Sequence, residues 1–279
     1  MSLPAFLIEP VVRAALAEDL GRAGDVTAAA CIPAGTRWTA VFAARRAGTI
    51  AGLDCARLAM TALDPEARFT ARIQDGRTVD PGTILAEVEA DARAILSAER
   101  TALNLLGRLS GVATLTRAYV DAVSSTTARI ADTRKTTPGL RALEKHAVAM
   151  GGGLNHRFGL DDAILIKDNH IAVCGGVGEA IRRARAHAGH LMKIEVEVDG
   201  LHQLDEALAG RPDVVMLDNF SLDDLRTAVE RARGEVVLEA SGGVSLQTVR
   251  AIADTGVDVI SVGALTHSAP SLDVGLDAG

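Results

Sequence analysis

The chain has 279 residues, of which 48% are hydrophobic and 23% charged, and this composition is typical of a globular protein with one large domain or two modest ones. Its formal net charge of -7 argues against nucleic acid as the main partner, because phosphate binding requires a concentrated basic surface. No run approaches the ~20 apolar residues of a membrane span, and the N-terminus lacks a secretory signal pattern. Three scattered cysteines, Cys31, Cys55 and Cys174, favour a reduced cytoplasmic location over a disulfide framework or a zinc site.

The first part of the chain predicts mixed helices and strands without a repeat. The patterns indicate a helix over 9–20, an extended stretch over 38–50, a helix over 54–63 and a strand over 68–73. Turn residues around 83–88 predict that residues 75–89 form a hairpin. From residue 92 the pattern is helical, with a break expected near Ser110 and Gly111. We therefore predict a separate α+β domain over residues 1–110.

The second part of the chain contains a repeat of short apolar runs, each ending in a polar residue or glycine and followed by mostly helical sequence. Strands that alternate with helices form parallel sheets, so this repeat predicts a closed or nearly closed α/β barrel over 111–265. In such barrels the site lies at the carboxyl ends of the strands. The predicted strands are 128–133, 163–167, 194–197, 214–218, 236–241 and 257–263.

A basic cluster lies between residues 132 and 170 of this acidic protein. A short helix is expected inside it, with Thr137 as its N-cap and Pro138 in its first turn. Three glycines, 151–153, then allow the backbone to turn and return toward Arg134. A solvated charged face is the alternative, but the charges lie at segment ends and not along a helix face. The cluster consists of Arg134, Lys135, His156, Arg157, Lys167 and His170.

Carboxylates follow the later strands. Lys193, Glu195 and Glu197 alternate with aliphatic residues, so one face of that strand is charged and should point into the barrel. Buried charges are costly unless they are paired or bind a ligand. Glu197 and Asp218 could therefore bind sugar hydroxyls or Mg²⁺. The alternative for both carboxylates is a structural salt bridge to Lys193 or Lys167.

Glycines follow the last two predicted strands, in Ser241-Gly242-Gly243 and Gly263-Ala264. Glycine lets backbone N–H groups approach an anion closely, and late barrel strands are where many barrels bind phosphate. Together with the cations and carboxylates, these turns predict a phosphorylated sugar and a second, polyanionic substrate.

Several strings, spaced in order along nearly all of the chain, closely resemble the decarboxylating type II quinolinate phosphoribosyltransferases. They are ERTALNLLGRLSG, DTRKTTPGLRALEKHAV, GGGLNHRFGLDDAILIKDNH, EVEVD, LDNF, ASGG and VGALTHS. The resemblance implies an N-terminal α/β sandwich domain, an open α/β barrel, and a C-terminal tail over 266–279 that returns to the first domain. It also implies transfer of a 5-phosphoribosyl group from phosphoribosyl pyrophosphate to quinolinate with decarboxylation and with Mg²⁺, yielding nicotinate mononucleotide for NAD biosynthesis.

The resemblance also implies roles for individual residues. Arg134, His156, Arg157 and Lys167 would bind the quinolinate carboxylates, with Thr133 and Lys135 lining the pocket. Glu197 and Asp218 would hold the ribose hydroxyls and any metal, and the implied catalytic residues are Lys135, Lys167, Glu197 and Asp218. Arg100 would reach into the site of a neighbouring subunit, which makes a homodimer with shared sites the expected active unit. The 5-phosphate would be bound by Ser241, Gly242, Gly243, Val262, Gly263 and Ala264.

The chain departs from the family pattern at His146, where tyrosine is expected, and at Ala149-Met150, where a more polar pair is common. Three rival functions remain at this point. A related barrel protein associated with molybdenum transport would lack LNHR and IKDNH, and a nicotinate-specific transferase would need fewer cations. A non-catalytic phosphosugar-binding module would not need the inward pair Glu197 and Asp218.

Overall fold

The computed structural model describes residues 3–279, and the chain divides into two compact units. The first contains residues up to 117 together with 136–152 and 266–279, and the second contains residues 118–135 and 153–265. None of the helices within residues 3–279 has both the length and the apolar character that a membrane span needs.

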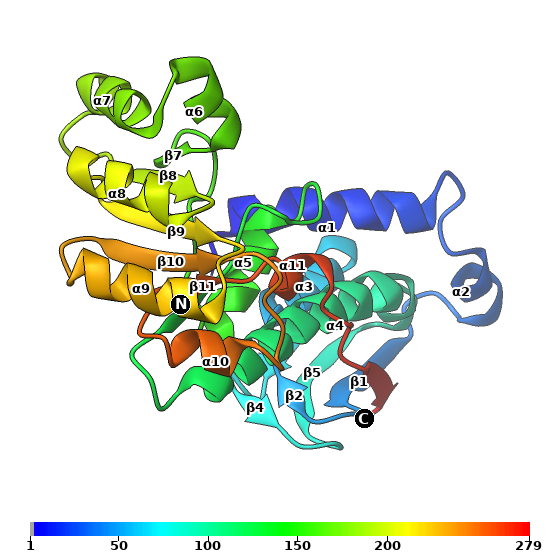
Figure 1. Ribbon diagram of the computed structural model, residues 1–279. Coiled ribbons are helices and arrows are strands. Elements are labelled where there is room, and N and C mark those ends of the chain that lie inside the picture. The colour runs from blue at the N-terminus through cyan, green and yellow to red at the C-terminus, as the bar shows by residue number, and fades with distance from the viewer. Residues whose placement is uncertain (1–2) are drawn as a thin grey trace. The chain divides into compact units, whose positions relative to one another are not determined.

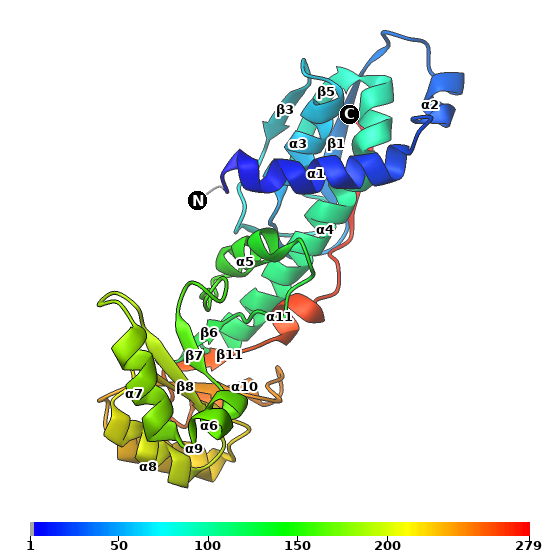
Figure 2. The ribbon, with the colours of Figure 1, turned by 90° about the horizontal axis from the view of Figure 1, so that it is seen from above.

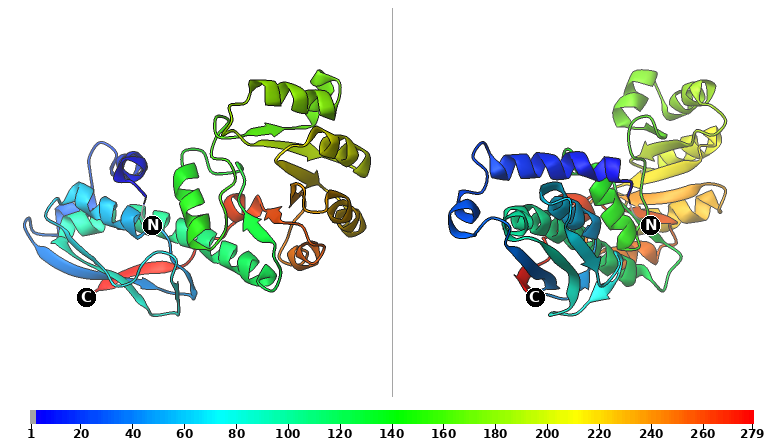
Figure 3. Two further views of the ribbon diagram at one scale, coloured as in Figure 1. Left: turned by 90° about the vertical axis from the view of Figure 1, so that its left-hand side faces the viewer. Right: turned by 180° about the vertical axis from the view of Figure 1, so that it is seen from behind.

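The first unit is built on a four-stranded antiparallel sheet in the order β12-β1-β5-β3. Its strands are β1 (Arg37–Ala44), β3 (Arg68–Ala71), β5 (Ile84–Asp91) and β12 (Val274–Ala278). Helices α1 (Ala5–Leu20) and α3 (Leu53–Leu63) pack on each other and lie over one face of the sheet, whereas the short α2 (Val26–Cys31) follows α1 (Figures 1 and 3). The expected helix over 54–63 is confirmed, and the helix expected over 9–20 begins four residues earlier, at Ala5.

The predicted hairpin over 75–89 is wrong. Strand β4 (Thr78–Val79) pairs with β2 (Gly48–Thr49), while β5 pairs with β1 and β3. The turn residues between β4 and β5 do reverse the chain, but the two strands enter different sheets. Alternation and turn residues identify strands, and they do not identify the partner of each strand.

The predicted break near Ser110 and Gly111 is also wrong, because α4 (Ala92–Val123) continues through it for 32 residues. The small residues there serve close packing. A Cβ added to Gly107 would lie 2.9 Å from the carbonyl oxygen of Leu272, and one added to Gly111 would lie 2.0 Å from that of Pro270. Two glycines one helical turn apart thus form the surface on which the C-terminal tail lies before it enters the sheet as β12.

Residues 136–152, which the sequence places in the barrel, pack in the first unit, and their helix α5 (Arg141–Met150) begins later than predicted. Thr137 is not its N-cap, because its hydroxyl donates to Glu144 Oε1 at 2.8 Å. Glu144 is fully buried and also accepts from Arg108 of α4, whose guanidinium lies 2.8 Å away. A buried ion pair of this kind costs several kcal/mol to break, since the remaining charge stays buried.

The second unit contains six parallel strands in the order β6-β11-β10-β9-β8-β7. No ladder joins β7 to β6, so the sheet is the open form of the predicted barrel. The strands, all at the predicted places, are β6 (Arg129–Ala131), β7 (Ile164–Ile166), β8 (Ile194–Val198), β9 (Val214–Asp218), β10 (Val237–Ser241) and β11 (Val259–Ser261).

Helices connect these strands and cover the outside of the sheet (Figures 1 and 2). They are α6 (Asp168–Cys174), α7 (Val177–His187), α8 (Leu201–Gly210), α9 (Leu222–Ala232) and α10 (Val249–Ala253). The short α11 (Ala264–His267) follows β11, and the chain then continues in the first unit. The aliphatic residues of each strand, such as Val196, Leu217 and Leu238, are buried, and the alternate residues form the inner face. Parallel strands place their carboxyl ends at one edge, which is where the polar residues of this chain collect.

We predict that Gly111→Ala destabilises the first unit. The new methyl group cannot coexist with the carbonyl of Pro270, and overpacking of this kind costs ~1–3 kcal/mol, more than the ~1 kcal/mol that alanine adds to helix stability. The measurement is the urea unfolding midpoint. Gly189→Ala is the matched control, since no atom lies within 4 Å of a Cβ built there. Equal midpoints for both variants would contradict close packing at Gly111.

Candidate functional site

A cavity of about 420 Å³ opens at the carboxyl edge of the six-stranded sheet. The cations that line it lie on the segments that follow β6 and β7 and on the loop before β7. The carboxylates lie on β8, β9 and β10. Its lining residues are Thr133, Arg134, Lys135, His156, Arg157, Leu165, Lys167, Glu197, Met216, Asp218, Glu239, Ser241 and Ser261.

The loop that carries His156 and Arg157 is held against the end of β6. The backbone N–H of Leu154 donates to the carbonyl of Ile130 at 2.7 Å, and its carbonyl accepts the N–H of Asp132 at 3.0 Å. Leu154 thereby forms a parallel β-bridge with Ala131 of β6. The buried carboxylate of Asp132 then accepts the backbone N–H of His156 at 2.8 Å. The glycine-rich segment therefore does return the chain to the side of Arg134.

Arg157 shows the electrostatic character of this cavity. Burial lowers the pKa of its guanidinium, and the nearby charge of Arg134 lowers it further, whereas Glu195 and Asp162 oppose both effects. Arg157 Nη1 donates to the carbonyl of Ala163 at 3.0 Å, but its buried Nε has no hydrogen-bond partner within residues 3–279. Two guanidinium groups held close together with a buried donor to spare form a site for an anion.

The carboxylates lie across the cavity from these cations. Lys167 forms an ion pair with Glu197, so the salt bridge weighed in the sequence analysis is present, at the mouth of the cavity. Asp218 accepts from the side-chain amide of Asn219 at 2.8 Å. Lys193 departs from the expectation that it points inward. It lies just before β8, is largely exposed, and pairs with Asp213 at 2.6 Å.

The turn after β10 contains two glycines with positive φ, Gly242 at 93° and Gly243 at 60°. A Cβ at Gly242 would lie 2.2 Å from Oδ1 of Asn219, so only glycine fits there. Ser241 itself lines the cavity. No Cβ covers the backbone of this turn at Gly242 and Gly243, so its N–H groups can approach an anion closely.

The remaining residues singled out from the sequence lie elsewhere. Gly242, Gly243, Val262, Gly263 and Ala264 follow the ends of β10 and β11 and are not among the lining residues. His170 accepts the backbone N–H of Lys167 at 2.9 Å and so serves the first turn of α6. Arg100 belongs to the first unit, on α4, beside a cavity of about 330 Å³ that is also lined by Asn104 and the tail residues 271–274.

Four residues that the structure places in or under the cavity had no predicted role, namely Asp132, Glu195, Glu239 and Ser261. Glu195 was expected to point inward, and it does, with a relative exposure of 7%. Glu239 carried a comparable signal, because it is the one carboxylate within the apolar run VVLEA. Side-chain alternation on β10 then places it on the same face as Ser241.

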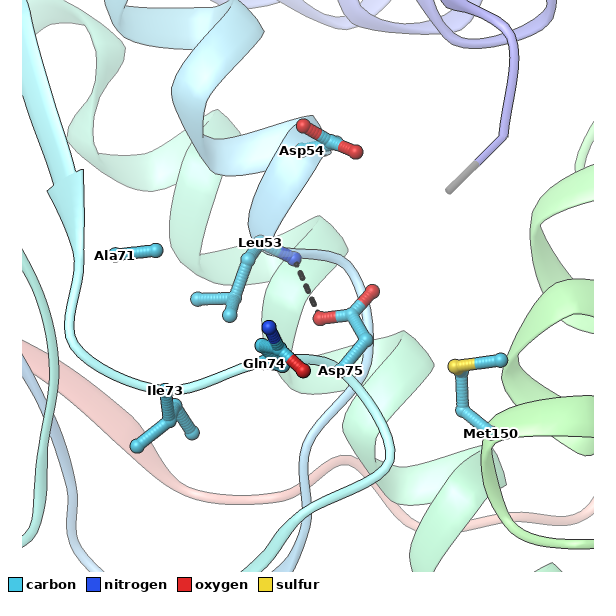
Figure 4. Close-up of a pocket in the computed structure, with 7 residues that line it drawn as sticks. All are labelled: Leu53, Asp54, Ala71, Ile73, Gln74, Asp75 and Met150. Carbon is cyan, nitrogen blue, oxygen red and sulfur yellow. Dashed lines mark hydrogen bonds between the residues drawn. The ribbon is translucent and has the colours of Figure 1, made fainter. Parts of the chain in front are cut away.

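A second cavity, of about 350 Å³, lies in the first unit and is lined by Leu53, Asp54, Ala71, Ile73, Gln74, Asp75 and Met150 (Figure 4). Its polar groups have structural partners. Asp75 accepts the backbone N–H groups of Gly52 and Leu53 at 2.9 and 3.2 Å and pairs with His146 at 3.2 Å. His146 therefore contacts the carboxylate of Asp75, a residue of its own unit. Burial, with Asp75 and Asp54, raises the pKa of the Cys55 thiol to about 12, so it is not a nucleophile.

For a metal, Glu197 and Asp218 supply oxygen ligands at the ends of neighbouring strands, which suits Mg²⁺. A second group also has close spacing: one potential ligand atom from each of His156, Glu195 and Glu239 lies within 4.8 Å of the other two. His156 Nδ1, however, accepts the backbone N–H of Arg157 at 2.8 Å. The ring proton is therefore on Nε2, where a metal would need a lone pair, so this second group does not fit a metal.

Comparison with known proteins agrees with this geometry. The family model described as "Quinolinate phosphoribosyl transferase, C-terminal domain" matches residues 112–277, and the corresponding N-terminal domain matches residues 25–110. A nicotinate-nucleotide pyrophosphorylase [carboxylating] of Mycobacterium leprae is 50% identical over 271 residues, 95% of each chain. A probable enzyme of the same name from Bacillus subtilis is 45% identical over 260 residues, 93% of this chain and 89% of the other.

Among solved structures, the nicotinate-nucleotide pyrophosphorylase from Francisella tularensis superposes with a TM-score of 0.95 at 41% identity, covering 100% of this chain and 98% of the other. NadC from Streptococcus pyogenes superposes with a TM-score of 0.96 at 40% identity, covering 100% and 98%. The similarity therefore extends over both units.

Proposed function

Since the chain belongs to the quinolinate phosphoribosyltransferase family, we propose that the cavity at the carboxyl edge of its six-stranded sheet is where quinolinate and phosphoribosyl pyrophosphate react. The chain transfers the 5-phosphoribosyl group to quinolinate with loss of CO₂, giving nicotinate mononucleotide and pyrophosphate in NAD biosynthesis. This family assignment displaces the molybdenum-associated, nicotinate-specific and non-catalytic alternatives.

The placement of quinolinate rests on two neighbouring cations in the cavity, Arg134 and the half-buried Arg157, whose charges repel each other. Repulsion between two guanidinium groups is relieved by a ligand with two carboxylates, and each arginine can bind a carboxylate through paired charge-assisted hydrogen bonds. Lys167 adds a third cation at the cavity mouth. Thr133 and Lys135 line the same wall.

Glu197 and Asp218, which both line the cavity, would bind the ribose of the donor. As pyrophosphate leaves, positive charge develops on the ribose ring, and two carboxylates in a confined site stabilise that charge. Because Lys167 already pairs with Glu197, the carboxylate is held in place before the donor arrives. Lys135 and Lys167 offset the negative charge of the leaving pyrophosphate.

The pyridine nitrogen of quinolinate attacks the ribose carbon, and the new pyridinium accepts the electron pair left when the 2-carboxylate departs as CO₂. A proton then takes the place of the lost carboxylate. No protein nucleophile is needed. Magnesium, held by Glu197 and Asp218 together with the donor, would supply positive charge to the pyrophosphate.

The 5-phosphate is assigned to the segments that follow β10 and β11. Ser241 offers a hydroxyl, and the positive φ of Gly242 and Gly243 supports a turn whose N–H groups face an anion. Val262, Gly263 and Ala264, which follow β11 at the same edge of the sheet, would complete the proposed cradle.

We further propose a homodimer in which Arg100 serves the partner's site. Arg100 is exposed, and within residues 3–279 it forms no hydrogen bond or ion pair. Its neighbours along α4, Thr101 to Leu103, are buried, so the helix is fixed while the guanidinium remains available. Higher oligomers would be assembled from this dimer.

The direct test of the function is an endpoint assay with phosphoribosyl pyrophosphate, Mg²⁺ and either quinolinate or nicotinate. Quinolinate should yield nicotinate mononucleotide and an equal amount of CO₂, because only two carboxylates satisfy the paired guanidinium groups. Nicotinate should give no product. Turnover of nicotinate at the quinolinate rate would contradict the proposed pocket.

We expect Arg134→Ala to lower kcat/KM for quinolinate by ~2–5 kcal/mol in transition-state free energy, the usual cost of removing one partner of a buried charge pair. Thermal unfolding should show that the fold is retained. Arg226→Ala is the matched control, since Arg226 is an exposed residue of α9 whose ion pair is with the exposed Asp223. A normal kcat/KM in Arg134→Ala would remove Arg134 from the site.

Mixing the inactive chains Arg100→Ala and Lys167→Ala should restore activity, because each heterodimer then has one pocket without either defect. Random exchange predicts about one quarter of the wild-type activity. Mixing Lys167→Ala with Arg134→Ala is the control, because both defects then lie in each chain's own pocket and no site is repaired. No recovery in the first mixture, with subunit exchange verified by mass, would contradict a shared site.

A further inference from the structure

Beneath the cations, the cavity has a floor of two glutamates, Glu195 on β8 and Glu239 on β10, which we call the acid floor. Both point to the inner face of the sheet, and His156 lies between them. Nε2 of His156 is 3.0 Å from Glu195 Oε2 and 3.7 Å from Glu239 Oε1. The side chains of the two glutamates are 9% and 6% exposed, so two acids are buried side by side.

The hydrogen bonds of His156 assign the charges on this floor. Its Nδ1 accepts from the backbone of Arg157, so the single proton of the neutral ring is on Nε2. That proton points to the nearer acceptor, Glu195, at hydrogen-bond distance, while 3.7 Å to Glu239 is too long. Glu195 is therefore the ionised acid, stabilised by the imidazole N–H.

Glu239 is in a different position. Its Oε1 is inaccessible to solvent and has no hydrogen-bond partner within residues 3–279. Burial raises the pKa of Glu239 to about 7, and the negative charges of Glu195 and Asp132 raise it as well, against the opposing effects of His156 and Ser261. A buried carboxyl beside an ionised one is most stable with its proton retained. Unlike Glu195, Glu239 also lines the cavity directly.

We propose that Glu239 is a substrate-binding residue that acts in its protonated form, donating a hydrogen bond from its carboxyl O–H to a carboxylate of quinolinate. This inference rests on the proposed placement of quinolinate in this cavity. A neutral acid that donates to a carboxylate makes a short, charge-assisted hydrogen bond, whereas the ionised acid would repel the dianion. Bound quinolinate in turn keeps the proton on Glu239, because its charge disfavours ionisation.

Other charged groups around Glu239 can also titrate or shift with pH, so the test must isolate Glu239 itself. Those that face it from β8, β9, the loop before β7 and the ends of β6 and β7 are Asp132, Arg134, Lys135, His156, Arg157, Lys167, Glu195, Glu197 and Asp218.

The experiment measures KM for quinolinate from about pH 6 to about pH 9 at saturating phosphoribosyl pyrophosphate and Mg²⁺, a range that brackets the titration. In the wild type, KM should rise by up to ~tenfold per pH unit above about pH 7, where Glu239 loses its proton. Glu239→Gln keeps a donor without a titrating group, so its KM should stay near the wild-type low-pH value and lose this rise. Glu239→Ala should have a high KM at every pH. Glu230→Gln, at an exposed position of α9, should behave as wild type.

The proposal is overturned if Glu239→Gln raises KM as much as Glu239→Ala, or if wild type and Glu239→Gln share one pH dependence. KM for phosphoribosyl pyrophosphate, measured in parallel, should not depend on Glu239, and an equal effect on both substrates also overturns it. Failure of the proposed function is a separate result, namely absence of quinolinate turnover by the wild type.

A second measurement needs no substrate. Because the pKa of Glu239 is raised on folding, from 4.5 to about 7, the folded protein binds more protons than the unfolded chain between these values, and stability falls as pH rises through that window. Glu239→Gln has no such proton. The Tm of the wild type relative to Glu239→Gln should therefore decrease from about pH 4.5 to about pH 7. A constant difference would mean that folded Glu239 is ionised, which overturns the proposal.

Discussion

Charges of opposite sign, stacked in layers at the carboxyl edge of one parallel sheet, are the constraint on which the site depends. Arg134, Arg157 and Lys167 line the cavity above, while Glu195 and Glu239 lie beneath it, on the inner face. Burying the cations alone would be too costly, because like charges would be concentrated in a medium that screens them poorly. The ionised Glu195 beneath them offsets part of this charge, and the two arginines still require an anionic ligand between them.

The backbone of the second unit produces this layering with simple means. Alternation along β8, β9 and β10 directs every second side chain inward, and parallel register brings Glu197, Met216 and Glu239 into one row across the sheet. The cations come from irregular segments that the strand ends hold in place. Asp132 is central to this arrangement, since its buried carboxylate holds the backbone of His156 and thereby positions Arg157.

The sequence was sufficient for the six strands of the second unit and for most of the cavity, because each of these follows from local patterns. Nine of the residues singled out for the site line the same cavity, from Thr133 to Ser241. What failed depended on contacts between distant segments. Gly111 looked like a helix break because a glycine pattern does not reveal that the carbonyl of Pro270 lies against it. Thr137 was predicted to cap a helix, but its hydroxyl donates a hydrogen bond to the buried Glu144. Glu239 was not predicted, because a single acid in an apolar strand indicates a site only when a second acid is known to lie beside it.

The path of the chain through its two units has a consequence for how the protein is made. The first unit needs residues 136–152 for the partner of Arg108 and residues 274–278 for an edge strand of its sheet. The second unit is complete once residue 265 has been synthesised. During translation the later segment can therefore finish folding first, while β1 waits with one edge unpaired until β12 leaves the ribosome. An unpaired strand edge is a target for chaperones and a route to aggregation, so the first unit is vulnerable until residues 274–278 have joined its sheet.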